Sequence, residues 1–371
     1  MTTPEGAAAD PADPRISLWS VPGIGEVSQG SDLVALIVTA TAAQPLRTGD
    51  LVVVASKVVA KAEGRQVSAL RRDEAIAAET ERVVAARALP DGRTTVVVQS
   101  HPGPVLAAAG VDASDVPEGT VLLLPADPDA SARRLRDGLQ AATGARVGVL
   151  ITDTAGRPWR AGVTDFCLGA AGLQVLDDRR GSVDTHGNTL SVTIRNVADE
   201  VAAAADLVKG KSAGTPVAIV RGLGALVDGS SDPGAGDLVR VGVTDWFRYG
   251  HVEAVWAALA RAGDDSWLPA HGAASIDPAE SVQARLARAV EVATATPRGA
   301  LDAVTRQVRV EVEPESVELQ GPMWPVAGMC ERLLTAAWAE DLDLSQPHPR
   351  DEVEGSGVQV RLRVVADRRA G

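Results

Sequence analysis

The chain has 371 residues, 45% of them hydrophobic and 23% charged, which is the composition of a folded protein of about two domains and excludes extensive disorder. Its formal net charge of -13 repels polyanions, which argues against nonspecific binding of nucleic acid or of an anionic membrane by the whole surface. The two cysteines, Cys167 and Cys330, have no CxxC partner, which argues against a disulfide framework or a zinc knuckle and fits a reducing, cytoplasmic compartment.

Residues 1–14 are rich in Ala, Pro and Asp and lack the basic and apolar regions of a signal peptide, so they indicate a loose tail. No run approaches the roughly 18 apolar residues that span a bilayer, and no membrane location is expected. Short runs rich in β-branched residues and bounded by Gly, Pro or Asp predict strands, and the stretches between them predict helices. The expected strands are 52–56, 94–98, 121–125, 147–154 and 216–222, and the expected helices are 73–88, 131–142 and 198–209.

The texture of the sequence changes near Tyr249. Beyond it we expect a Trp-containing helix, a helix at 284–293, a strand at 308–313, a helix at 329–340 and a strand at 358–365. The chain is therefore predicted to be a mixed α/β protein. Residues 15–250 are expected to form one domain, and residues 251–371 a C-terminal α/β extension of unknown role.

The densest polar motif is the segment DTAGRPWRAG, which starts at Asp153 directly after a predicted buried strand. Ligands of open α/β sheets bind at the carboxyl ends of strands, and a carboxylate beside a hydroxyl or carbonyl supplies the oxygen ligands that Mg²⁺ prefers. Alternatively, Asp153 caps a turn and Arg157 and Arg160 are solvated or salt-bridged. Spacing alone does not separate these two interpretations.

A second acid, Asp112, follows the small-residue segment AAAG. It would hold a metal if it converged with Asp153, although an isolated Asp in this setting is more often an Asx turn or a helix cap. After the strand at 52–56, Ser56 and Lys61 are candidates for contacting phosphate oxygens. The segment KGKSAG at 209–214 lacks the GxxxxGK[ST] pattern of a P-loop and remains a candidate anion-binding turn.

Several segments together resemble one known family. They are VPGI at 21–24, SKVVAKAEGR at 56–65, AAAGVD at 107–112, LPADPDASA at 124–132, ITDTAGRPWRAG at 151–162, and DTHGNTL at 184–190 followed by VADEVAAAADLVKGK. In this order they closely resemble the coenzyme F420:L-glutamate ligase family, from about residue 16 to about residue 250. The resemblance implies a two-part α/β ligase fold, a homodimer, and a cleft for a nucleotide and divalent metal ions.

The resemblance also implies roles for individual residues. Asp112, Asp153 and Thr154 match metal-binding positions. Nucleotide-contacting positions are matched by Ile24, Gly25, Glu26, Val27, Ser56 and Lys61, and more weakly by Gly210 and Lys211. Asp115 stands where the family usually has a nucleotide-contacting Asn, and a carboxylate accepts hydrogen bonds but donates none.

The activity implied is ligation of L-glutamate to coenzyme F420-0 through an acyl phosphate, with GTP as co-substrate and Mg²⁺ or Mn²⁺, and K⁺ as a further ion. Arg157 and Arg160 are candidates for holding substrate phosphate or carboxylate groups, and a pair with a nearby acid is the alternative. Two other functions remain open. One is a degenerate nucleotide-binding regulatory or scaffold protein, which Asp115 favours, and the other is a related ligase for another amino acid.

Overall fold

The computed structural model describes residues 15–210, 213–227, 233–240, 245–260, 274–275, 277, 279–295, 306–347, 349–353 and 357–369. The expected loose tail at 1–14 lies outside this range. Within the described residues, helices and strands alternate along the chain, which confirms the mixed α/β class. No helix among these residues is long and apolar enough to cross a membrane.

The chain divides into two compact units, and the division does not follow the linear sequence. Unit 1 contains residues 1–81 and 99–240, and unit 2 contains residues 82–98 and 241–371. A segment far from the C-terminus therefore belongs to the unit that holds most of the C-terminal residues. The domain boundary near residue 250 stays a prediction.

Unit 1 is built on the five-stranded sheet β1-β12-β2-β8-β9, in which only β2 and β8 run parallel. Side chains alternate between the two faces of these strands. On one face Val52, Val54 and Ile151 pack with helices α1 and α4. On the other face Val53 and Leu150 pack with α5. The sheet is thus covered on both sides, as the near-continuous apolar runs of β2 and β8 require. The bounds are β1 Ser17–Ser20, α1 Leu33–Ala40, β2 Leu51–Ala55, α2 Ser56–Ala62, β3 Gln66–Ser68, α3 Arg72–Ala78, β6 Val105–Ala107, β7 Thr120–Leu122, α4 Pro128–Thr143, β8 Gly148–Arg157, β9 Arg160–Ala171, β10 Leu176–Asp178, β11 Ile194–Asn196, α5 Val197–Lys209 and β12 Val217–Arg221.

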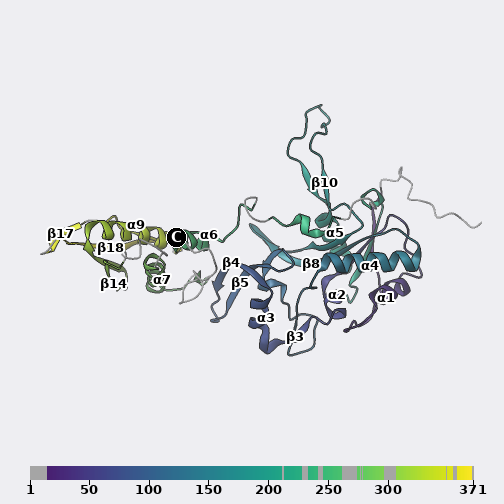
Figure 1. Ribbon diagram of the computed structural model, residues 1–371, viewed down its shortest axis with the longest axis horizontal. Helices are drawn as coiled ribbons and strands as arrows, with labels where there is room; N and C mark the ends of the chain where they lie inside the picture. Colours follow the sequence, from purple (N-terminus) through teal and green to yellow (C-terminus); the bar gives the residue numbers. More distant parts are fainter. Residues whose placement is uncertain are drawn as a thin grey trace, which may run out of the picture. The chain divides into compact units, whose positions relative to one another are not determined.

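Strands β10 and β11 pair antiparallel and carry a ribbon that projects away from the body of unit 1 (Figure 1). Val183 and Val192 within this ribbon are 65% and 84% exposed, so it adds little to the core. The main core of unit 1 lies between the sheet and its helices.

The helix expected at 73–88 is wrong in its second half. Helix α3 ends at Ala78, and residues 80–88 form strand β4 (Thr80–Ala88). Val83 and Val84 are β-branched and favour a strand, and β4 pairs with β13 (Ala274–Ser275), a partner that local sequence does not reveal.

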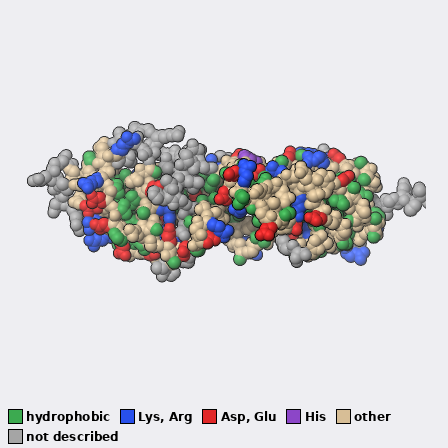
Figure 2. Space-filling model, turned by 90° about the horizontal axis from the view of Figure 1, so that it is seen from below, with side chains coloured by type: hydrophobic (Ala, Val, Ile, Leu, Met, Phe, Trp, Pro, Cys, Tyr) green, Lys and Arg blue, Asp and Glu red, His purple; other side chains and the backbone are tan. Residues whose placement is uncertain are grey.

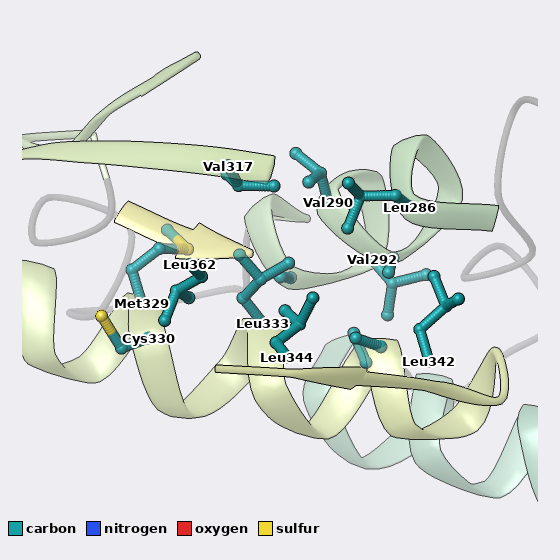
Figure 3. Close-up of a cluster of buried hydrophobic side chains, with 14 of the residues drawn as sticks. Leu286, Val290, Val292, Val317, Met329, Cys330, Leu333, Leu342, Leu344 and Leu362 are labelled. Carbon is teal, nitrogen blue, oxygen red and sulfur yellow. The ribbon is translucent and has the colours of Figure 1, made fainter. Parts of the chain in front are cut away.

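Unit 2 has a second five-stranded sheet, of order β14-β15-β18-β16 with β17 paired to β18. Leu319, Leu333, Leu362 and other apolar side chains join this sheet to helices α7 and α9 in one core, part of which Figure 3 shows. The bounds of the remaining elements are β5 Thr94–Ser100, α6 His251–Ala260, α7 Val282–Thr294, β14 Arg309–Glu313, β15 Ser316–Pro322, α9 Met323–Ala339, β16 Leu342–Leu344, β17 Pro349–Val353 and β18 Gly357–Asp367.

Helix α6 is anchored to β4 within unit 2. Both carboxylate oxygens of Glu253 contact Arg87, and Oε1 also accepts a hydrogen bond of 2.9 Å from the backbone N–H of Ala86. The Glu253 side chain is fully buried. Its charge is therefore satisfied only as long as β4 and α6 stay together.

Candidate functional site

The candidate site lies where β2 ends beside its parallel neighbour β8. Ala55, the last residue of β2, pairs with Thr152 of β8. The chain then turns from β2 directly into α2, which starts with Ser56 and Lys57, while β8 continues to Asp153. The carboxyl edge of this strand pair thus carries a hydroxyl, an ammonium and a carboxylate, as expected for a ligand-binding edge.

The sequence interpretation of Asp153 as a residue at a strand end before a turn is wrong in detail. Strand β8 runs on to Arg157 and forms a hairpin with β9 that turns at Pro158 and Trp159. The cause is that β9 supplies backbone partners as far as Arg160, so the strand outlasts its parallel neighbour β2. Arg157 and Arg160 pair across the hairpin and are exposed. At about 3.3 Å per residue, Arg157 lies about 13 Å along the strand from Asp153.

Asp112 sits in a small hydrogen-bonded cluster. Its Oδ1 accepts from the backbone N–H of Ser114 at 2.9 Å, and its Oδ2 accepts from the Ser114 hydroxyl at 2.7 Å. This is the Asx turn considered as the alternative to a metal-binding role. The ammonium of Lys57 lies 2.6 Å from Asp112 Oδ2 and also contacts the Ser114 hydroxyl. Partial burial alone would raise the pKa of Asp112, but the hydrogen bonds from Lys57 and Ser114 outweigh it and lower that pKa.

Asp153 has the opposite electrostatic character. Burial raises its pKa to about 6, with the carboxylates of Asp165 and Asp112 adding to the rise. The backbone N–H of Thr154, which donates to Asp153 Oδ1 at 2.9 Å, and the charge of Lys57 only partly offset this effect. Asp153 is therefore a carboxylate whose charge is short of compensation, next to a second carboxylate that remains ionised.

These two acids fit a hard divalent cation. Carboxylate oxygens are the ligands that Mg²⁺ and Mn²⁺ prefer, and a cation beside Asp153 would supply the missing positive charge. No cluster of three or more His, Cys, Asp or Glu side chains suited to a metal occurs within the described ranges. A metal at this edge would therefore complete its ligands with backbone or hydroxyl oxygens, water or oxygen atoms of its substrates.

The expected nucleotide contacts divide into buried and accessible groups. Ile24 and Val27 are core residues of unit 1, whereas Gly25 and Glu26 between them are exposed. The Ser56 side chain is buried at the start of α2. Gly210, with φ of +65°, ends α5, and Lys211 lies outside the described residues. At Ile24 and Val27 only the backbone is available to a ligand, because their side chains are buried in the core.

Lys61 and Asp115 face each other. The Nζ of Lys61 lies 2.9 Å from Oδ2 of Asp115. Asp115 has a left-handed backbone with φ of +57°, which Asn and Asp tolerate better than most residues. Both residues were expected at nucleotide-contacting positions, and the structure brings them together as an ion pair.

Sequence reasoning missed a buried polar cluster on the other face of β8. Lys209 Nζ donates to Thr152 Oγ1 at 2.7 Å and to Asp165 Oδ2 at 2.8 Å, and the hydroxyl of Thr154 donates to Asp165 Oδ1 at 2.6 Å. The side chains of Lys209 and Asp165 are only 4% and 3% exposed. The one available signal was a polar residue inside the apolar run of β9. Thr154 thus turns its hydroxyl away from the face that carries Asp153 and Asp112.

The described part of the face seen in Figure 2 shows no broad patch of basic side chains. Acidic and basic side chains are interspersed over the described part of the face shown in Figure 2. A phosphorylated ligand would therefore be held by local groups such as Lys57, because charges separated by more than about 8–10 Å are screened.

Comparison with known proteins identifies the relatives of this chain. The sequence profile of the F420-0:Gamma-glutamyl ligase family matches residues 23–222. The Coenzyme F420:L-glutamate ligase of Archaeoglobus fulgidus is 38% identical over 236 residues, which cover 59% of this chain and 92% of the relative. The protein of that name from Methanopyrus kandleri is 40% identical over 228 residues (57% of this chain, 88% of the relative), and that from Methanothermobacter thermautotrophicus 37% over 257 residues (63% and 99%).

Proposed function

The chain belongs to the F420-0:gamma-glutamyl ligase family, and on this premise we propose that it ligates L-glutamate to coenzyme F420-0 with GTP and a divalent metal ion. Membership confirms the resemblance seen in the sequence and the expected enzyme class, an acid–amino-acid ligase. The observation that best supports the proposed chemistry is the placement of Asp112, Asp153 and Lys57 near the end of β2, where it leaves its pairing with β8.

In the proposed reaction a carboxylate oxygen of F420-0 attacks the γ-phosphorus of GTP, which forms an acyl phosphate and releases GDP. The α-amine of glutamate then attacks the acyl carbon, inorganic phosphate leaves, and the amine loses a proton as the amide forms. Such transfers need charge neutralisation and alignment more than a protein nucleophile. A divalent cation held by Asp112 and Asp153 would neutralise phosphate charge.

The residues of the chain have matching tasks in this proposal. Lys57 pairs with Asp112, its charge also acts on Asp153, and it is proposed to move from Asp112 toward a phosphate oxygen once a cation takes its place. Thr154, whose hydroxyl donates to Asp165, and the segment Ile24–Val27 are proposed to contribute backbone contacts. Arg157 and Arg160, exposed at the tip of the β8–β9 hairpin, are proposed to meet charged groups of a large substrate rather than the reacting atoms.

The proposal is tested with purified protein, F420-0, L-glutamate, GTP and either Mg²⁺ or Mn²⁺. We expect a product heavier by one or more glutamate residues and one GDP for each glutamate added, with mass spectrometry and nucleotide chromatography as the measurements. Replacing glutamate by other amino acids in parallel reactions tests the alternative of a related ligase with another substrate.

The ion pair between Lys61 and Asp115 favours a second candidate, a nucleotide-binding regulatory or scaffold protein without turnover, because it ties up a lysine expected at phosphate. GTP binding without hydrolysis in the presence of glutamate and F420-0 would support this candidate over the ligase. Release of GDP that depends on glutamate would exclude it.

A further inference from the structure

The buried pair of Asp165 and Lys209 has no place in the reaction proposed above. Its charged groups are almost fully removed from solvent and lie 2.8 Å apart. Burying an ion pair costs desolvation energy, and replacement by apolar residues of similar volume is often neutral or stabilising. Stability alone is therefore a weak explanation for these two charges.

The pair lies where strand β8 loses the pairing with β2 and keeps the pairing with β9. Up to Thr152, strand β8 is flanked by β2 on one side and β9 on the other. Beyond Thr152, β9 is the only backbone partner of β8 among the described strands, so the position of Asp153 and Thr154 depends on what holds the β8–β9 ribbon. Lys209, the last residue of α5, binds Thr152 of β8 and Asp165 of β9 at this place.

A second tie from α5 acts on the same strand. Asp199, in the first turn of α5, accepts a hydrogen bond of 2.8 Å from the backbone N–H of Cys167 in β9. Both ends of α5 are thus hydrogen-bonded to β9, at Asp165 and at Cys167, which are two residues apart. Of the two ties, only the one through Asp165 reaches β8 by side-chain contacts, because Asp165 Oδ1 also accepts from the Thr154 hydroxyl.

We propose that Asp165 and Lys209 are positioning residues of the metal site, which from the α5 face of β8 hold the strand so that Asp153 on the opposite face is kept beside Asp112. This inference rests on the proposed function, because it assumes that Asp153 and Asp112 bind the metal. Groups that orient metal ligands typically change metal affinity by about 10–100-fold when they are removed.

The matched variants are Asp165→Asn/Lys209→Met and Asp165→Leu/Lys209→Met. Both remove the two buried charges and keep similar volumes. The Asn variant keeps an acceptor oxygen for Thr154 and an amide that donates to Thr152, whereas the Leu variant keeps neither. Mn²⁺ binding is measured on the full chain without substrates, from the electron paramagnetic resonance signal of free Mn²⁺, and thermal unfolding is followed on the same samples.

We expect the Leu variant to bind Mn²⁺ about 10–100-fold more weakly while its Tm stays equal to or above that of the wild type, and the Asn variant to keep most of the affinity. A lower Tm with wild-type Mn²⁺ affinity in the Leu variant would assign the pair a purely structural role and overturn the inference. Equal losses of affinity in both variants would trace the effect to Lys209, which both variants lack, and would reject the positioning role of Asp165. If leucine prevents folding, alanine at position 165 removes the acceptor without crowding.

Asp153→Asn separates this inference from the proposed function. Mn²⁺ affinity that is unchanged in Asp153→Asn would show that the proposed metal site itself is wrong. A large loss in Asp153→Asn, together with no loss in the Leu variant, would reject only the positioning role of Asp165 and Lys209.

Discussion

The ammonium of Lys61 lies 2.9 Å from the carboxylate of Asp115, so a lysine expected to contact nucleotide phosphate is paired with an acid. A phosphate group that binds Lys61 must displace Asp115 from it, and the carboxylate that stays nearby repels the phosphate. The geometry therefore predicts that Asp115 weakens nucleotide binding.

Asp115→Asn is expected to tighten GTP binding by about two- to fivefold, the range set by an exposed ion pair, and to preserve ligation. Isothermal titration calorimetry with GTP measures the change. Asp178→Asn is the matched control, because it removes an exposed carboxylate paired with Arg180 and alters the net charge equally. Weaker GTP binding in Asp115→Asn would mean that the carboxylate itself has a favourable role.

The raised pKa of Asp153 predicts a stability that falls with rising pH in the metal-free protein. Its carboxyl group binds a proton near pH 6 when folded but near its ordinary value of 3.8 when unfolded. Folding thus favours the neutral form, and this contribution is present below about pH 4 and lost as the pH rises through about 6. Asp153→Asn should exceed the wild type in unfolding free energy by about 1–2 kcal/mol at pH 8 and match it at pH 4.

Urea denaturation of both proteins at pH 4, 6 and 8 in the presence of a chelator measures this difference. A difference in unfolding free energy that does not change with pH would contradict the raised pKa of Asp153. Addition of Mn²⁺ at pH 8 should reverse the order of stabilities, because binding to the folded state stabilises only a protein that retains the site.

Mn²⁺ affinity is expected to fall as the pH drops below about 6, by about tenfold per pH unit, because the metal competes with a proton for Asp153. Asp112 stays ionised over this range, since Lys57 and Ser114 lower its pKa below the ordinary value. Asp153→Asn should show weak affinity without this pH dependence and should lose ligation. Tight binding of Mn²⁺ by the wild type at pH 5 would contradict the proposed role of Asp153.

The edge of the sheet could be predicted from the sequence. The β-branched runs at 52–56 and 147–154 indicate buried strands, and Ser56 and Asp153 lie at or near their carboxyl ends. The sequence did not reveal that β8 outlasts β2, since this depends on pairing with β9. The Asp165–Lys209 pair was equally hidden. The two residues are 44 positions apart, and only the packing of α5 on the sheet brings them together.

The assignment of 80–88 to a helix failed for a related reason. Ala-rich segments favour helices, and the competing strand is stabilised by contacts with residues more than 160 positions away, such as Glu253. The contacts of Glu253 with Ala86 and Arg87 would be lost in a chain that is shortened before α6.

A chain that ends at residue 250 should still bind GTP and Mn²⁺, because every matched motif precedes that point, but it should be less soluble than the full protein. Loss of α6 removes Glu253, which accepts from Ala86 and pairs with Arg87, and leaves β4 without its helix. Strands with unpaired backbone groups and apolar side chains promote association. Size-exclusion chromatography and calorimetry with GTP measure the two properties.

The matched control is the same shortened chain with residues 82–98 replaced by a short Gly-Ser linker. These residues are the N-terminal segment of unit 2. This variant removes the strand surface that α6 covers in the full protein, so it should regain solubility and keep GTP binding. If it is folded and soluble but binds no GTP, residues 82–98 or those beyond 250 take part in nucleotide binding. If the simple truncation is as soluble as the full chain, the burial of Glu253 against β4 contributes less to folding than its complete removal from solvent implies.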